Sequence, residues 1–245
     1  MSIQRFDGLL LVNKPAGLSS VDVLRQLKKI LGPQIKIGHA GTLDPFATGL
    51  LIVCLGRGTR LVPLLMDVSK GYKVKARFGG LTATLDLTGE VLAEQEVPTS
   101  FEPLVEKTIS LLGTQYKQIP PIFSALKHEG APLYRLAREE MLTQEMLEQL
   151  VQQKARWVII YKLIIENIEH PTVSFSCEVS KGAYIRSLAD DLAQKVGLRA
   201  TTEELVRTFI GPFSMQKAYH LEALTSPENI ATALINVEKA RTLLA

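Results

Sequence analysis

One acidic residue in a glycine-rich loop is the side chain of this sequence best suited to chemistry. The segment from Gly38 to Leu51 reads GHAGTLDPFATGLL, and Asp44 is its single carboxylate, followed at once by Pro45. A carboxylate can serve as a nucleophile or as a general base. Aspartate before proline is also common in ordinary turns, and spacing alone favours such a turn.

The elements beside this loop should form a hydrophobic scaffold for it. Residues 50–55 read LLIVCL between Gly49 and Gly56, which predicts a buried strand. A second short strand is expected from Leu9 to Val12. Ser19 or Ser20 can cap a helix that runs through Leu31, because apolar residues recur on one face of this segment.

The rest of the chain mixes strand and helix patterns without a strict βαβ order. From Tyr72 to Phe78 apolar and basic residues alternate, which predicts a strand with its aromatic rings toward the core. Thr201 with Glu204 resembles a capping box, which would open a last short helix and make Leu205 helical. The other expected elements are helices over 56–66 (weakened by Pro63), 101–112 and 185–196, a polar helical excursion over 133–153, and strands over 157–168 and 172–179. We therefore expect an α+β fold, with a mixed, largely antiparallel central sheet flanked by helices.

The composition is that of an ordinary globular protein. The 245 residues, 46% hydrophobic and 22% charged, suit one large domain or two small ones. A net charge of +3 is only mildly basic and does not by itself indicate a nucleic-acid partner. Cys54 and Cys177 both lie in apolar runs, so we expect buried free thiols and a reducing cytoplasm. The four histidines lack metal-ligand spacing, and no signal sequence or membrane-length apolar run is present, so neither a metal nor a membrane is expected as a partner.

Five ordered stretches of the sequence resemble the TruB class of tRNA pseudouridine synthases. The Asp44 segment meets every fixed position of that family's pattern G-H-x-G-x-L-D-P-x-A-T-G-x-L. The other stretches are LVNKPAGLSS at 11–20, GYKVKARFGGLTATLDLTGE at 71–90, QIPPIFSALKHEGAPLYRLAR at 118–138 and KGAYIRSLADDLA at 181–193. The likeness covers roughly residues 8 to 213, and several motifs in order are far more specific than one short pattern. It implies the pseudouridine synthase fold.

The resemblance implies an isomerase that converts uridine to pseudouridine in the T-loop of tRNA, at position 55. In that reaction the N-glycosidic bond breaks, the base turns, and a carbon–carbon bond forms. No electrons are exchanged and no group is donated, so no cofactor is expected. The target base must leave its stack before an enzyme can reach it. The family likeness assigns catalysis to Asp44, Tyr72 and Arg186, and substrate binding to His39, Leu205, Tyr184 and Lys14.

The same resemblance gives these residues their tasks. Asp44 must stay ionised in an apolar pocket, and the forked guanidinium of Arg186 is suited to holding it charged. Tyr72 would stack on the base or exchange a proton through its hydroxyl. His39 would fill the space that the base vacates, and Leu205 would lie under the base.

From the residues alone, simpler roles remain open. Arg186 fits a surface arginine on a first helical turn, and His39 fits a capping or surface histidine. Lys14 fits either a structural role or a phosphate contact. Basic residues that could bind phosphates, or simply be solvated, are Lys70, Lys73, Lys75, Arg77, Lys127, Arg135, Arg138 and Lys181.

The sequence departs from the family pattern at three positions. Val206 stands where the family usually has a second arginine that contacts RNA, and Lys181 and Ala183 replace commoner residues near Arg186. Many relatives also carry a C-terminal PUA RNA-binding domain. We expect a catalytic domain at 1–213 with a helical excursion at about 127–154, and a tail at 214–245 that is too short for a PUA domain. A monomer is expected.

Other classes of function make different demands on the sequence. A non-catalytic tRNA-binding protein or tRNA-folding chaperone on the same fold would not need an acid in this loop. A small-molecule glycosidase would need a second carboxylate nearby, and the loop supplies none. A guide-RNA-dependent relative that modifies ribosomal RNA would depend on the additional C-terminal domain.

Overall fold

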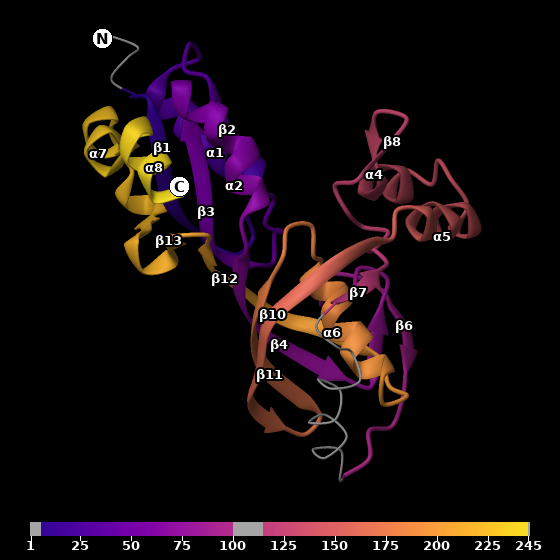
Figure 1. Cartoon of the computed structure of the whole chain (residues 1–245). Helices are drawn as coiled ribbons and strands as arrows, with labels where there is room; N and C mark the ends of the chain where they lie inside the picture. Colours follow the sequence, from indigo (N-terminus) through magenta and orange to yellow (C-terminus); the bar gives the residue numbers. More distant parts are fainter. Residues whose placement is uncertain (1–5, 100–114, 245) are drawn as a thin grey trace. The chain divides into compact units, whose positions relative to one another are not determined.

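The computed structural model describes residues 6–99 and 115–244, which form two compact units (Figure 1). The first unit combines the chain up to Lys73 with the chain from Leu205 onward, and the second unit runs from Val74 to Glu204. Strands β4 (Lys70–Phe78) and β12 (Ala200–Ile210) therefore contribute residues to both units.

Two long hydrophobic strands form the centre of the first unit. β1 (Gly8–Lys14) is antiparallel to β3 (Thr48–Leu55) along its whole length, and β3 is parallel to β12. The hydrogen-bonded order in this unit is β14-β1-β3-β12-β4. Its short strands are β2 (Ile37–His39), β13 (Phe213–Ser214), β14 (Tyr219–His220) and β15 (Ile235–Asn236).

The unbroken apolar run of β3 is explained by burial of both of its faces. Leu51 and Val53 belong to one hydrophobic cluster, whereas Leu50 and Ile52 belong to another. A strand covered on both sides reads as a continuous hydrophobic run rather than as an alternation. The predicted buried strand is confirmed, and this strand directly follows the Asp44 loop.

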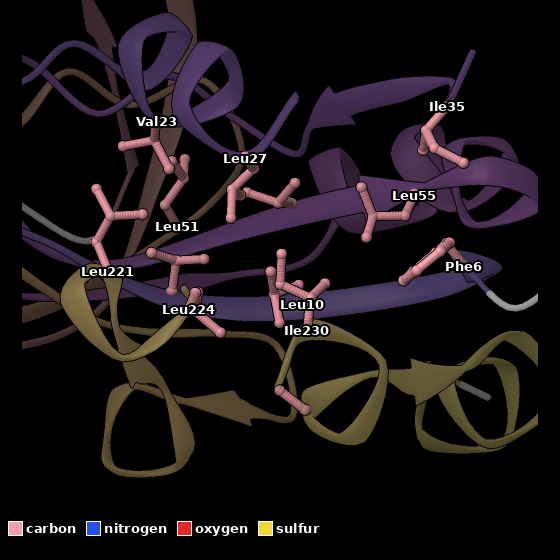
Figure 2. Close-up of a cluster of buried hydrophobic side chains, with 13 residues drawn as sticks. Phe6, Leu10, Val23, Leu27, Ile35, Leu51, Leu55, Leu221, Leu224 and Ile230 are labelled. Atoms are coloured by element: carbon pink, nitrogen blue, oxygen red, sulfur yellow. The ribbon is translucent and has the colours of Figure 1, made fainter. Parts of the chain in front are cut away.

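Helix α1 (Ser20–Leu31) covers one face of these strands and is confirmed with its predicted cap. The Ser19 hydroxyl accepts a hydrogen bond from the Asp22 N–H, and the Asp22 carboxylate accepts one from the Ser19 N–H, which is a capping box. Figure 2 shows side chains of α1, β1 and β3 meeting those of the C-terminal segment. The C-terminal contributions are Leu221, Leu224, Ile230 and Ala233.

The other helical segments of the first unit are short. Residues 56–67 form a 3₁₀ segment (Gly56–Leu61) and then α2 (Val62–Asp67). The expected helix over 56–66 is therefore divided in two, and Pro63 lies in the first turn of the second part, where its missing N–H costs nothing. The C-terminal segment adds two 3₁₀ turns (Met215–Lys217 and Leu221–Ala223), α7 (Pro227–Ala233) and α8 (Val237–Leu244).

In the second unit, β10 (Arg156–Glu169) pairs antiparallel with β11 (Thr172–Val179) and with β7 (Gln115–Gln118). The strand order of this unit is β12-β4-β11-β10-β7. Helix α6 spans Ile185–Gln194. The remaining elements are β5 (Gly80–Thr82), β6 (Val91–Glu94), β8 (Lys127–His128), β9 (Ala131–Pro132), α4 (Leu133–Arg138) and α5 (Gln144–Gln153).

The helical excursion is confirmed as α4 and α5, which bury a small cluster of their own around Leu133 and Leu147. The alternation of β4 is confirmed as well, since Tyr72 and Phe78 are buried whereas Lys73 and Arg77 are exposed. The expected helix over 101–112 lies outside the described residues. These elements make up the expected α+β fold, and its sheet is mostly antiparallel.

One predicted element is wrong. Thr201 and Glu204 do not open a helix, because residues 200–210 form strand β12 and Leu205 lies within it. The segment ATTEELVRTFI is rich in β-branched and aromatic residues, which fit a pleated sheet. Pairing of Val206 with Thr48 and of Phe209 with Ser214 overrides the local capping signal.

Cys54 and Cys177 are confirmed as buried free thiols, and burial raises the pKa of each to about 12. Among the helices of the described ranges, none has the length and hydrophobicity required to cross a membrane. The same ranges contain no group of three or more His, Cys, Asp or Glu side chains that could hold a metal ion.

Candidate active site

The loop that carries Asp44 is fixed through its backbone carbonyls. The Arg207 guanidinium donates to the carbonyls of Gly41 and Thr42, each at 3.2 Å. The Ser20 hydroxyl holds both backbone groups of Leu43, since it accepts from the N–H at 2.8 Å and donates to the carbonyl at 3.1 Å.

The second half of the loop is held in the same way. The Asp44 carbonyl accepts from the Ala47 N–H at 3.1 Å, which closes a tight turn. The Pro45 carbonyl accepts from the Gly17 N–H at 2.8 Å and from the Lys14 ammonium at 3.3 Å. Each of the five carbonyls from residue 41 to residue 45 therefore has a donor, so the backbone that carries the half-buried Asp44 side chain is positioned before any substrate binds.

Lys14 has a structural role in this loop. Its side chain is fully buried, and its ammonium also donates to the carbonyls of Leu18 at 2.7 Å and Pro15 at 2.8 Å. Burial lowers the pKa of Lys14 to about 8, while the charge of Asp44 acts in the opposite direction and Arg207 lowers it further. Of the two roles expected for Lys14, this geometry supports the structural one over a phosphate contact.

His39 is half-buried and is the last residue of β2, five residues before Asp44. Burial is the main cause that lowers the pKa of His39, and the Arg207 charge lowers it too, against a hydrogen bond with the Gly41 backbone. A lowered pKa keeps the imidazole neutral at neutral pH. A neutral ring suits the stacking task that the sequence predicts for it.

Tyr72 and Leu205 are buried side chains of neighbouring elements in the first unit. Tyr72 is 7% exposed in β4, and Leu205 is 5% exposed in β12. The register pairs Val206 with Thr48, so Leu205 lies next to the point where the loop enters β3. The aromatic core position predicted for Tyr72 is confirmed.

Arg186 is the second residue of α6 and is only 4% exposed, so its alternative reading as a surface arginine is wrong. Its guanidinium donates to the carbonyl of Thr84 and, at 2.9 Å, to that of Phe123. Its Nη1 lies 3.6 Å from Oδ2 of Asp86.

Asp86 is a buried partner of Arg186 that sequence reasoning missed. Its Oδ1 accepts from the Thr84 hydroxyl at 2.8 Å, the Thr88 N–H at 2.9 Å and the Thr88 hydroxyl at 2.6 Å. Threonines two residues before and after an aspartate are the sequence signal for such a local network. The network orients the carboxylate that faces Arg186.

Tyr184 occupies the N-cap position of α6, which has no side-chain cap of its own. Gln118 replaces the cap, since its amide accepts from the Tyr184 N–H at 2.7 Å and donates to the Tyr184 carbonyl at 3.0 Å. The Arg156 guanidinium lies 5.0 Å from the centre of the Tyr184 ring. The start of the helix that carries Arg186 is thus fixed from β7.

The predicted site residues divide between the two units. Tyr184 and Arg186 belong to the second unit. The expected ion pair between Arg186 and Asp44 stays a prediction. The residues in the first unit are Lys14, His39, Asp44, Tyr72 and Leu205.

Lys70 does not belong to a phosphate-binding face. Its side chain is 7% exposed, and its ammonium donates to the carbonyls of Val68 at 2.7 Å and Met66 at 3.0 Å. Lys75 lies 3.8 Å and Arg77 3.9 Å from carboxylate oxygens of Glu203. Lys73, Lys127, Arg135, Arg138 and Lys181 are exposed.

Comparison with known proteins places this arrangement in a family. Residues 28–185 match the family described as TruB family pseudouridylate synthase (N terminal domain). The chain is 41% identical over 233 residues to tRNA pseudouridine synthase B of Thermotoga petrophila, covering 95% of this chain and 72% of that protein. It is 39% identical to the protein of the same name from Clostridium tetani, covering 96% of this chain and 78% of the relative.

Solved structures agree with the sequence relatives. A Cbf5-Nop10-Gar1 complex contains a chain of 27% identity with a TM-score of 0.71, covering 98% of this chain and 64% of that one. An H/ACA RNP bound to a substrate RNA containing 2'-deoxyuridine gives 25% identity and a TM-score of 0.68, covering 95% and 60%. This chain thus spans less than two thirds of the length of those two chains. By its sequence, its fold and its held aspartate loop, the chain belongs to the TruB family of pseudouridylate synthases.

Proposed function

We propose that this chain converts the uridine at position 55, in the T-loop of tRNA, to pseudouridine. Relatives named tRNA pseudouridine synthase B, at about 40% identity, support an isomerase that acts on tRNA uridine. The single observation that carries a catalytic role is the Asp44 loop, whose backbone is held at every carbonyl from residue 41 to residue 45. A protein that only binds RNA gains nothing from an acid held in this way.

The reaction requires one reactive group at the junction of base and sugar. Asp44 supplies a carboxylate there, as a nucleophile or as a base that removes a sugar proton. All atoms of the uridine are retained, so neither a redox partner nor a group donor takes part. Because the loop is fixed beforehand, little reorganisation is needed when the substrate arrives, which lowers the barrier.

Arg186 is proposed as the cation that keeps Asp44 ionised, a pairing that rests on the family motif. In the second unit the guanidinium is oriented by Asp86 and by two backbone carbonyls. Planar guanidinium groups can bind several acceptors at fixed angles, which a lysine cannot. Asp86 is therefore proposed as a residue that positions Arg186.

The remaining site residues handle the base. The uridine leaves the RNA stack to reach Asp44, which costs unstacking energy that new contacts must offset. Tyr72 would stack on the flipped base over Leu205, and a neutral His39 would occupy the vacated space. Tyr184 would line the binding site from the start of α6. The partner is the T-arm of tRNA, and the enzyme would act in the cytoplasm as a monomer.

The test uses unmodified tRNA and an isolated T-arm hairpin. Pseudouridine has the same mass as uridine, so it is located by a chemical derivative that adds mass selectively. The expected result is one pseudouridine at position 55 with the wild-type protein and none with Asp44→Asn. Binding of tRNA without any modification would instead support the non-catalytic tRNA-binding or tRNA-folding alternative.

A further inference from the structure

We propose that Arg207 is a positioning residue that sets the place of the Asp44 carboxylate by holding the two ends of its loop together. The inference rests on the proposed function, because it gives Asp44 the catalytic task. Arg207 itself lies in β12 and contacts the loop backbone, not the acid side chain.

The three acceptors of Arg207 lie on both sides of Asp44. Its Nη atoms donate to Gly41 and Thr42, which precede the acid, and its Nε donates at 2.7 Å to the Leu50 carbonyl, which follows it. One planar group therefore fixes the entry and the exit of the loop. A lysine ammonium is a point charge on a flexible stem and could not bind three carbonyls in these directions.

The backbone of the same residue also approaches the loop closely. Arg207 pairs with Gly49 in the parallel register of β12 and β3. A Cβ added to Gly49 would lie 2.4 Å from the Arg207 carbonyl oxygen, and the φ of Gly49 is +101°. Only glycine permits this approach. The main chain of Arg207 therefore contacts the exit of the loop at Gly49, beside the Leu50 carbonyl that its side chain binds.

Stabilisation of the fold is by itself a weak explanation for Arg207, because this side chain is buried without an ionic partner among the described residues. Arg207 is 1% exposed, and within residues 6–99 and 115–244 its partners are neutral carbonyls and no carboxylate. Removing such a charge from water is expensive, and apolar residues of similar volume are often more stable. The charge does act locally, since it lowers the pKa of both His39 and Lys14.

Lys70 offers a matched control in the same unit. It too is a buried cation that donates to three carbonyls, those of Leu65, Met66 and Val68, but these lie at the end of α2. Arg207→Met and Lys70→Met both remove a buried charge and leave carbonyls without a donor. Only the first change releases the Asp44 loop.

The experiment compares the two variants in the full-length protein. The readouts are kcat and Kd for the T-arm hairpin, the thermal midpoint, and hydrogen exchange of the backbone amides. For Arg207→Met we expect kcat to fall about 100-fold or more, since a misplacement near 1 Å has that effect, while Kd stays near the wild-type value. Amide exchange at residues 41–50 should accelerate. For Lys70→Met we expect a similar change in thermal midpoint, faster exchange near α2, and nearly unchanged kcat.

Two results overturn the proposal: a loss of kcat no larger in Arg207→Met than in Lys70→Met, or unchanged exchange at residues 41–50 in Arg207→Met. If Arg207→Met does not fold, Arg207→Gln keeps one amide donor and is judged by the same criteria, with partial effects expected. If the wild-type protein forms no pseudouridine, the proposed function fails, and the exchange at residues 41–50 still decides whether Arg207 holds the loop.

Discussion

Two buried cations, Lys14 and Arg207, lie beside the loop of the proposed catalytic acid. Both bind backbone carbonyls, and both are almost completely withdrawn from water. Buried charges are costly unless hydrogen bonds satisfy them, and here the backbone of the loop supplies those bonds. At the scale of single residues, the acid is thus placed by the main chain around it.

Replacing the acid gives the first prediction. Asp44→Asn is nearly isosteric, so the fold and RNA binding should survive, but an amide is a poor nucleophile and a poor base. We expect turnover to fall at least about 1,000-fold. Single-turnover pseudouridine formation, with tRNA binding and thermal midpoint measured in parallel, checks this. Substantial residual turnover would remove Asp44 from the chemistry.

Arg186→Lys should be far from conservative. A lysine could stay charged, yet it could not meet Asp86 and the carbonyls of Thr84 and Phe123 together. The expected outcome is a loss in kcat on the order of 100-fold, with little change in affinity for tRNA. Steady-state kinetics on the T-arm hairpin test it, and an unchanged kcat would contradict the proposed role of Arg186.

The lowered pKa of Lys14 predicts that the stability of the folded chain depends on pH. Its pKa is about 8 in the folded chain against 10.5 for an ordinary lysine. Between these values the unfolded chain binds a proton that the folded chain lacks, so the contribution of Lys14 to the free energy of unfolding rises with pH, by at most about 1.4 kcal/mol per pH unit. Below pH 8 both states are protonated and its contribution is constant.

The measurement is urea unfolding of the wild type and of Lys14→Met at several pH values. Other titrating groups are shared by the two proteins, so the difference in stability isolates Lys14. The wild type should gain on the variant as the pH is raised from about 8 to 10. A difference that stays constant over this window would show that the pKa of Lys14 is not lowered.

At the scale of elements, the start of α6 is held by a buried polar network instead of a local cap. Gln118 binds both backbone groups of Tyr184 and donates to the Tyr116 hydroxyl at 2.6 Å. Tyr116 in turn donates to the Asp191 carboxylate at 2.9 Å. The network connects β7 to the helix that carries Arg186.

Asp191 makes this element sensitive to pH. Burial raises its pKa to about 6, against the lowering effect of the Tyr116 hydrogen bond. The folded chain binds the Asp191 proton more tightly than the unfolded chain does. The contribution of Asp191 to the free energy of unfolding is therefore present at low pH and is lost as the pH rises through 6. Asp191→Asn keeps an acceptor for Tyr116 and removes the charge.

We therefore expect the free energy of unfolding of Asp191→Asn to exceed that of the wild type by on the order of 1–2 kcal/mol near pH 7.5, which raises its unfolding temperature. Near pH 4.5 this difference in stability should disappear. Thermal unfolding at the two pH values provides the test. Glu166→Gln, on an exposed side chain of β10, should show no such crossover. A variant less stable than the wild type at neutral pH would argue against the raised pKa.

Elements with a clear period were predictable, and those that depend on distant partners were not. The β3 run and the β4 alternation follow from side-chain periodicity. β12 was mistaken for a helix because its strand character comes from pairing with β3 and β13. In the site, Asp44 could be found from its motif, whereas Arg207 lies 165 residues from its acceptor Thr42 and has no local signal.

At the scale of the whole molecule, the C-terminal residues complete the first unit. β14 and β15 pair with β1, and Leu221, Leu224 and Ile230 enter the core cluster that contains α1. The segment expected as a short tail is thus a part of this core (Figure 2).

Ile230→Ala should accordingly destabilise the protein by about 2–5 kcal/mol, the usual effect of emptying a fully buried isoleucine site. Leu243→Ala in α8, where the side chain is 44% exposed, serves as the control and should change little. Urea unfolding of both variants measures the difference. Equal effects of the two changes would mean that the segment does not pack in the core.

The division of the first unit into an early and a late segment also sets the order in which a newly made chain becomes competent. Translation delivers Asp44 and its loop long before Arg207, because the whole of Val74–Glu204 is synthesised between them. Until Arg207 leaves the ribosome, the loop lacks the guanidinium that joins its ends. A nascent chain therefore carries its acid without this means of holding it until β12 has been synthesised, and the proposed activity is expected only after that point.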